Sequence, residues 1–211
     1  MKKIIIFFTI FYLSAFDLLP NEAIIQNNGS INKTIPKGET GYIIQNNMII
    51  GKVVSMGGNK VKYLPFEKLK NEALATPKLY PKKGDKIIFG LYNKRGLIIA
   101  PNQQFYIKTK KEYPNIKWIN SDNFAIYFET KPTIEDFRKF CNDYNVGIII
   151  FILDKKYIVD SQSFTILEKA ELTENYKYSK PFFATYNKFA DSIFSFKPTN
   201  WINYYKSLLK D

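Results

Sequence analysis

The sequence predicts an α+β protein with a small β-barrel-like N-terminal lobe followed by an α/β lobe that has a central buried strand. Up to about residue 100, short strand-like runs are separated by glycine and asparagine turns, a pattern typical of β-structure. After Pro101, helical and strand-like patterns alternate, as they do in α/β proteins. The 211 residues, 45% of them hydrophobic, are enough to bury a core. We therefore expect residues 16–100 and 101–211 to be two lobes of one compact unit.

The first lobe is expected to consist of short strands joined by tight turns. The pair Asn46-Asn47 and residues 93–96 are turn sequences, and each predicts a hairpin. A short helix is expected over residues 66–75, where apolar residues recur at helical spacing between two prolines. A small sheet of this kind can bury its edges by curling, which favours a barrel-like shape. The expected strands are residues 23–26, 42–45, 48–56, 60–64, 86–91 and 97–100.

The second lobe is expected to alternate helices and strands around a strand at residues 148–153. This run is almost continuously apolar, which is typical of a strand buried on both faces. Asn102, Ser121 and Thr133 are each expected to cap a helix, and Asp136 is expected to complete a capping box with Thr133. Further strands are expected at 116–119, 157–159, 164–167 and 193–196, and a last helix at 198–210.

The first fifteen residues have the pattern of a secretory signal peptide. Lys2 and Lys3 precede an apolar run over residues 4–13, and Ser14 and Ala15 are the small residues of a cleavage site. Cleavage is expected after Ala15. The apolar run is shorter than the roughly 20 residues that span a membrane, so no transmembrane helix is expected after cleavage, and an uncleaved anchor is the alternative.

The charge of the chain is strongly basic and comes almost entirely from lysine. Loss of residues 1–15, which carry two lysines and no acidic residue, lowers the formal net charge from +12 to +10. Arg95 and Arg138 are the only arginines, whereas recognition of phosphates and base edges depends on the arginine fork. No specific nucleic-acid site is expected. Association with an anionic envelope surface or with a lysine-binding partner is expected instead, and a solvated, solubilising lysine surface is the alternative.

Composition also excludes most enzyme classes that act near neutral pH. The sequence contains no histidine, which removes His-dependent triads and His-zinc sites. The single cysteine, Cys141, cannot form an intramolecular disulfide or a multi-thiolate cluster, and we expect it to be buried on the apolar face of a helix. No catalytic, cofactor-binding or metal-binding residue is expected, and the protein is not expected to be an enzyme.

Two pairs of carboxylates are the remaining candidates for acid–base chemistry. Glu135 and Asp136 lie in the first turn of an expected helix, where the helix dipole favours negative charge. Asp154 and Asp160 flank an expected hairpin, so structural roles are expected for both pairs. The glycines, including Gly57-Gly58, have neither the phosphate-loop nor the dinucleotide-binding spacing.

The aromatic residues between 176 and 205 allow two interpretations. Exposed aromatic side chains would form a binding face for a peptide or a glycan. Trp201, Tyr204 and Tyr205 recur at helical spacing, which favours packing of the last helix on the sheet.

Four segments, in this order, resemble a known family. They are FEKLKNEALATPK at 66–78, GLIIAPNQQFY at 96–106, DNFAIYF at 122–128 and DFRKFCNDYNVGIIIFILDKKYIVDSQSF at 136–164. On this basis, most of the chain after residue 15 resembles the N-terminal domain of the plasminogen-binding proteins of Campylobacter and Helicobacter relatives.

The resemblance implies an exported, non-enzymatic protein of the periplasm or cell surface of a Gram-negative bacterium, with plasminogen as its partner. In longer members of the family, binding is associated with a C-terminal lysine, whose ammonium and carboxylate groups would pair with opposite charges in a kringle pocket. The corresponding candidates in this sequence are Lys210 and Asp211. A periplasmic or envelope scaffold protein that does not bind plasminogen is the alternative.

Overall fold

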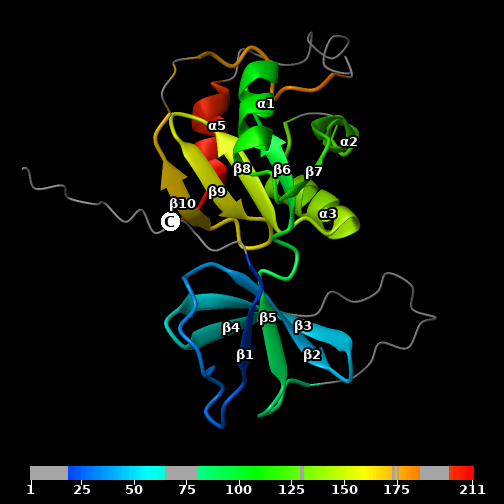
Figure 1. Cartoon of the computed structure of the whole chain (residues 1–211), viewed down its shortest axis with the longest axis vertical. Coiled ribbons are helices and arrows are strands. Elements are labelled where there is room, and N and C mark those ends of the chain that lie inside the picture. Colours follow the sequence, from blue (N-terminus) through cyan, green and yellow to red (C-terminus); the bar gives the residue numbers. More distant parts are fainter. Residues whose placement is uncertain (1–18, 65–79, 129–130, 173, 175, 186–199) are drawn as a thin grey trace, which may run out of the picture.

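The computed structural model describes residues 19–64, 80–128, 131–172, 174, 176–185 and 200–211. The expected signal peptide, the helix over 66–75 and the strand over 193–196 lie outside these residues. The described part of the chain forms two five-stranded sheets and four helices, so the predicted α+β class is confirmed. The two sheets belong to two lobes that lie one above the other (Figure 1).

The first sheet is antiparallel and has the strand order β1-β5-β2-β3-β4. Asn46 and Asn47 join β2 to β3 with φ angles of 50° and 59°, the left-handed conformation of the predicted two-residue hairpin turn. Because β1 and β4 lie at opposite edges, the sheet is open and is not a closed barrel. Its strands are β1 (Asn21–Ile24), β2 (Thr40–Gln45), β3 (Met48–Gly57), β4 (Lys60–Leu64) and β5 (Lys86–Phe89).

The second sheet is mixed and has the strand order β10-β9-β8-β6-β7. Strand β6 runs parallel to β7 and β8, whereas β8, β9 and β10 are antiparallel neighbours. Every residue of β8 is buried, which confirms the predicted central strand. The strands are β6 (Arg95–Ile99), β7 (Lys117–Ile119), β8 (Ile148–Ile152), β9 (Lys156–Asp160) and β10 (Ile166–Ala170).

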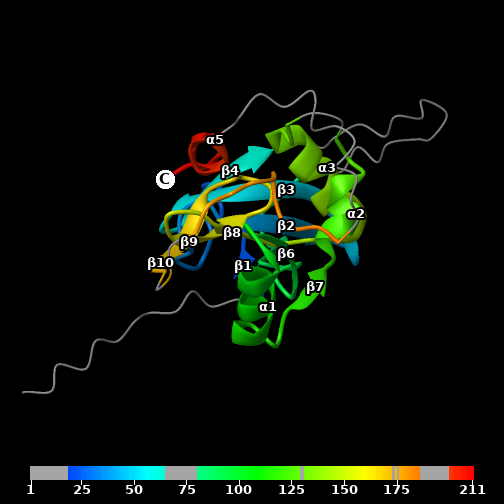
Figure 2. The ribbon, with the colours of Figure 1, turned by 90° about the horizontal axis from the view of Figure 1, so that it is seen from above.

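Helices cover both faces of the second sheet, which gives this lobe three layers (Figure 2). The helices are α1 (Gln103–Glu112), α2 (Ser121–Ala125), α3 (Ile134–Tyr144) and α5 (Trp201–Leu208). Helix α1 packs Phe105 and Tyr106 against one face, while α2, α3 and α5 pack on the other face around Phe124, Phe137 and Tyr205. Burial of Trp201 and Tyr205 confirms the packing interpretation for the last helix.

Strand β6 corrects the predicted hairpin between residues 86–91 and 97–100. Strand β5 pairs with β1 and β2, whereas β6 pairs with β7 and β8 in the other sheet. Residues Leu97, Ile98 and Ile99 are completely buried, and a strand that is apolar on both faces needs a layer on each side, which the second lobe supplies. The sheets therefore divide between Phe89 and Arg95, ahead of the expected boundary at residue 100, while the expectation that the two lobes form one compact unit stays a prediction.

The helix caps agree with the sequence in two of three places. Asn102 accepts a hydrogen bond from the Phe105 amide at the start of α1. Thr133 and Asp136 form the full capping box of α3, because the shorter aspartate side chain still reaches the Thr133 amide at 2.7 Å. The cap of α2 is Asn120 and not Ser121, whose hydroxyl donates to the Phe183 carbonyl instead.

Candidate functional site

Lys210 and Asp211 follow α5 and lie beside the loop between β9 and β10. The Lys210 amide donates to the Phe164 carbonyl at 2.9 Å, and the Ile166 amide donates to the Lys210 carbonyl at 2.8 Å. These two bonds form a parallel bridge and fix the main chain of Lys210. Its side chain is exposed, and within the described part of the chain its ammonium group has no hydrogen-bond or ion-pair partner. Lys210 therefore presents an exposed ammonium group from a fixed main chain.

Asp211 is held by two lysines from different lobes. Its carboxylate accepts a bond of 2.6 Å from Lys169 on β10, which lowers the pKa of the Asp211 carboxyl below its ordinary value. Its main-chain oxygen accepts a bond of 3.0 Å from Lys37 of the first lobe. Because the pair with Lys169 is exposed to solvent, exchanging it for another partner costs little free energy.

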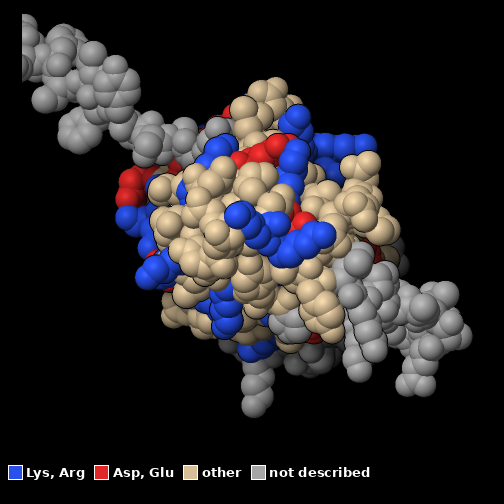
Figure 3. Space-filling model, turned by 90° about the horizontal axis from the view of Figure 1, so that it is seen from below, with Lys and Arg blue, Asp and Glu red and all other residues tan. Residues whose placement is uncertain are grey.

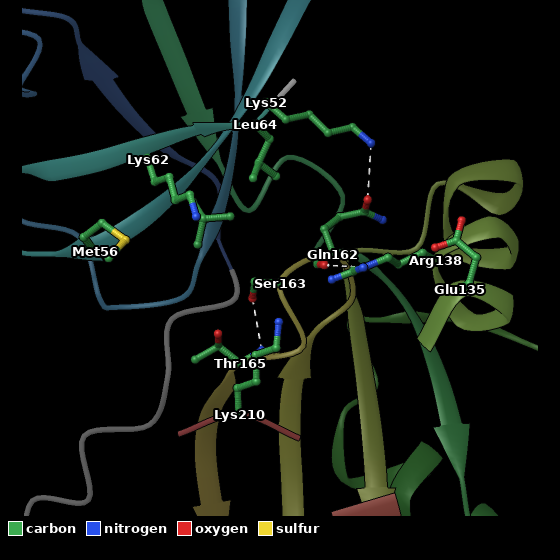
Figure 4. A pocket seen from close by; sticks show the side chains of 11 residues that line it. Lys52, Met56, Lys62, Leu64, Glu135, Arg138, Gln162, Ser163, Thr165 and Lys210 are labelled. Carbon is green, nitrogen blue, oxygen red and sulfur yellow. Dashed lines mark hydrogen bonds between the residues drawn. The ribbon is translucent and has the colours of Figure 1, made fainter. Parts of the chain in front are cut away.

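Between the two lobes lies a groove with a cavity volume of about 350 Å³, named here the interlobe groove (Figure 4). One wall comes from β3 and β4 of the first lobe. The other wall comes from the start of α3, the loop between β9 and β10, and Lys210. The side chains that carry its chemistry are the basic residues Lys52, Lys62, Arg138 and Lys210, the acidic residue Glu135, and the apolar residues Val54, Met56 and Leu64.

Arg138 is oriented in the interlobe groove by two contacts. Its Nε donates to the Gln162 carbonyl at 2.8 Å, and its guanidinium lies 5.9 Å from the centre of the Phe164 ring. The two terminal guanidinium nitrogens make no hydrogen bond to any described residue. The arrangement leaves a planar pair of donors available to an incoming anion.

Asp160 fastens the two lobes together next to the groove. It is 3% exposed, and its carboxylate accepts bonds from the Thr40 amide at 2.9 Å and the Thr40 hydroxyl at 2.7 Å. The amides of Gln162 and Ser163 donate to the same carboxylate at 3.0 and 2.8 Å. Burial raises the pKa of the Asp160 carboxyl, while the bonds from Ser163 and Thr40 act in the opposite direction.

Further contacts between the lobes surround this carboxylate. The Ser163 hydroxyl donates to the Gly38 carbonyl at 2.6 Å. Lys52 reaches from β3 to the side-chain oxygens of Asn142 and Gln162, each at 3.2 Å. Asp160 therefore serves as the structural residue that the sequence predicts, and the walls of the groove are held in a fixed relation.

The other predicted carboxylates do not meet at one place. Asp154 lies ahead of β9, at the end opposite Asp160, where it accepts bonds from the Tyr157 hydroxyl and the Lys206 ammonium. The Lys206 bond contributes to lowering the pKa of Asp154 against the opposing effect of burial. Asp136 belongs to the capping box, and Glu135 lies at the groove.

Cys141 lies on the buried face of α3, as predicted. It is 1% exposed and packs in the core between α3 and the second sheet. Burial raises the pKa of the Cys141 thiol, so the reactive thiolate form is disfavoured. Within the described residues, no group of three acidic, cysteine or histidine side chains could hold a metal ion.

The sequence did not single out the groove residues Lys52, Lys62 and Arg138. The strand period does indicate part of this set. Residues 52, 54 and 56 share one face of an expected strand, and residues 62 and 64 share one face of the next. What the sequence does not reveal is which part of the second lobe lies over that face.

The fold and the groove together define a two-lobed α+β protein with a basic surface between its lobes. Within the described part of the chain, no helix has the length and apolar character needed to cross a membrane. The chain belongs to the family described as plasminogen-binding protein pgbA N-terminal, whose model matches residues 19–209. This match confirms the resemblance noted from the sequence.

Two relatives come from Helicobacter pylori strains J99 and 26695, and each is named plasminogen-binding protein PgbA. They are 33% and 32% identical to this chain in alignments of 178 residues, which cover 80% of this chain. That alignment covers 40% and 39% of the relatives, so the chain spans about two fifths of their length. No solved structure matches the chain.

Proposed function

We propose that the protein is an exported, non-enzymatic binding protein of the periplasm or cell surface that binds plasminogen through lysine side chains, with Lys210 and Asp211 as the principal ligands. The name of the family and of the two relatives supports plasminogen as the partner. The basic charge of the chain and the signal-peptide pattern of residues 1–15 support a secreted protein that meets an acidic pocket.

The geometry of Lys210 carries this proposal. Two main-chain hydrogen bonds fix its backbone, while the ammonium group is exposed and without a partner among the described residues. A fixed backbone lowers the conformational entropy lost when a partner binds the side chain. The Asp211 carboxylate supplies the adjacent negative charge once a partner replaces its solvent-exposed contact with Lys169.

The general lysine surface is a weaker candidate for specific recognition. Seen from the first-lobe end, basic side chains are scattered among uncharged residues and do not form one continuous patch (Figure 3). Scattered cations attract an acidic protein at long range, and added salt screens that attraction strongly. A defined ligand such as Lys210 is expected to remain effective at physiological salt.

The test is binding of residues 16–211 to immobilised plasminogen at physiological salt, with and without a soluble lysine analogue. We expect the analogue to abolish binding and Lys210→Ala to weaken it about tenfold. Lys83→Ala is the matched control, because Lys83 is an exposed lysine of the first lobe and is remote from Lys210 in the described contacts. Binding that the analogue does not reduce, or that both variants reduce equally, would reject the proposal in favour of an envelope scaffold role.

A further inference from the structure

The first-lobe wall of the interlobe groove presents alternating cationic and apolar side chains. Strands β3 and β4 pair with Lys52 opposite Leu64 and Val54 opposite Lys62. The two lysines are therefore diagonal neighbours, at a spacing of roughly 7–8 Å, and Val54 and Leu64 occupy the other diagonal. Val53, on the opposite face of β3, is completely buried in the core of the first lobe. The groove-facing lysines are thus on the side of the sheet that the core does not use.

The second-lobe wall adds two cations, Arg138 with an oriented guanidinium group and Lys210 with a fixed main chain. Arg138 is held by the Gln162 carbonyl and by the Phe164 ring, and its terminal nitrogens remain available. Lys210 reaches the same hollow from its main-chain bridge with Thr165 (Figure 4). Among the described lining residues, these four basic side chains face one acidic side chain, Glu135. The groove therefore has a clear excess of positive charge.

The cations of the groove are placed for an extended ligand. Lys62 has no hydrogen bond or ion pair to any described residue, so its ammonium is available like the terminal nitrogens of Arg138. The apolar side chains Val54, Met56 and Leu64 form a strip beside these cations. An apolar strip next to separated positive charges matches a chain that alternates carboxylates with apolar groups.

Two features favour carboxylates over phosphate groups. A single arginine takes part, whereas phosphate recognition relies on several arginine forks or on a cradle of main-chain amides. The amides at the start of α3 are engaged by the Thr133 and Asp136 capping box, and Glu135 in that first turn would repel a multiply charged phosphate. One carboxylate on the Arg138 fork satisfies its two terminal nitrogens.

We propose that the interlobe groove is a second binding site, which shares Lys210 with the proposed plasminogen site but is otherwise distinct from it, and that it holds an acidic segment of a partner protein in an extended conformation. One carboxylate of the segment binds the terminal nitrogens of Arg138, and a second binds the ammonium group of Lys62. Apolar side chains of the segment contact Met56 and Leu64. Because the Asp160 contacts fix the two walls, the site exists before the ligand arrives.

The test is the fluorescence anisotropy of a dye-labelled peptide of alternating glutamate and leucine, titrated with the purified full chain at physiological salt. We expect saturable binding that Arg138→Gln weakens about tenfold, which corresponds to about 1.4 kcal/mol. Arg138→Lys keeps the positive charge but loses the paired donors of the guanidinium group. We therefore expect its affinity for the peptide to lie between those of Arg138→Gln and the unmodified protein. Lys62→Gln, an exposed change that breaks no described contact, is expected to weaken binding about threefold.

The controls separate this site from general attraction and from the proposed plasminogen site. Lys83→Gln removes the same charge outside the groove and should leave peptide affinity unchanged. The Arg138 and Lys62 variants should still bind plasminogen. Loss of peptide binding can therefore be distinguished from loss of plasminogen binding. Equal losses for Lys62→Gln and Lys83→Gln, or no saturable peptide binding, would overturn the proposal. Arg138-dependent binding of inorganic phosphate or anionic lipid vesicles without peptide binding would also overturn it.

Discussion

At the scale of single residues, the Asp160 carboxylate joins the two lobes. Four donors from two lobes converge on one buried carboxylate, and two of them belong to Thr40 of the first lobe. The sequence identified Asp160 as a structural carboxylate at a hairpin, but it could not indicate Thr40 as a partner, because the two residues are 120 positions apart. Long-range pairing of this kind depends on tertiary packing and leaves no local pattern.

The first prediction concerns this carboxylate. Asp160→Asn replaces an acceptor oxygen with an amide nitrogen, so at least one of the buried donors loses its partner. We expect the free energy of unfolding to fall by about 1–3 kcal/mol, measured by urea denaturation at neutral pH. Asp143→Asn, the same change at an exposed residue, should cost less than about 0.5 kcal/mol. Equal effects of both substitutions would contradict the role assigned to Asp160.

A second prediction concerns the thiol of Cys141. Because burial blocks access and raises its pKa, we expect a thiol-reactive dye to label the native protein at least about a hundredfold more slowly than the urea-unfolded protein. The measurement is the rate of dye incorporation with and without denaturant. Labelling of the native protein at the rate of an unfolded chain would show that the α3 face is open to solvent.

At the scale of elements, strand β8 is predictable from the sequence, whereas the sheet to which β6 belongs is not. Strand β8 was found because its apolar run is long and continuous. Strand β6 carries the shorter buried run Leu97–Ile99, which was assigned to a hairpin because a turn-like segment precedes it. The same segment, residues 90–94, instead carries the chain from one sheet to the other.

The third prediction tests how closely this connection packs against the second sheet. The Gly147 amide donates to the carbonyls of Tyr92 and Arg95, each at 3.1 Å. A methyl group at Gly147 would overlap main-chain atoms of Tyr92 and Asn93, which cannot move aside as a flexible side chain can. We expect Gly147→Ala to lower the free energy of unfolding by about 1–3 kcal/mol in urea denaturation.

The control for this substitution is Gly51→Ala in β3. A methyl group there would meet the end of the Ile43 side chain at 3.4 Å, an ordinary contact. We expect it to change stability by less than about 1 kcal/mol. If the two substitutions lowered the free energy of unfolding equally, the result would contradict the close contact between Gly147 and the connection at residues 92 and 93.

At the scale of the whole molecule, hydrogen bonds across the interlobe contact join the two lobes. The core of the first lobe is smaller than that of the second, and small domains bury a smaller fraction of their surface on folding. The contacts through Asp160, Ser163 and Lys52 couple it to the larger core of the second lobe. The groove residues could not be assembled from the sequence for the same reason, since they come from both lobes.

The fourth prediction is that both lobes unfold in a single transition. Trp118 and Trp201 both belong to the second lobe, so their fluorescence follows that lobe, whereas far-ultraviolet circular dichroism follows both sheets. We expect the two signals to give the same urea midpoint. Two separated midpoints would show that the lobes are independent folding units.

The Asp160 carboxylate accepts hydrogen bonds from both lobes, and it therefore also provides a way to observe their separation directly. The amides of Thr40, Gln162 and Ser163 all donate to Asp160, although Thr40 comes from the other lobe. In hydrogen–deuterium exchange, a motion that parts the lobes without unfolding either sheet would break the bond from the Thr40 amide to Asp160. The amides of Gln162 and Ser163, which lie in the same loop as Asp160, and the amides of β8 would stay protected. The exchange rate of the Thr40 amide would therefore give the free energy of lobe opening, and a ligand that spans the groove would slow it.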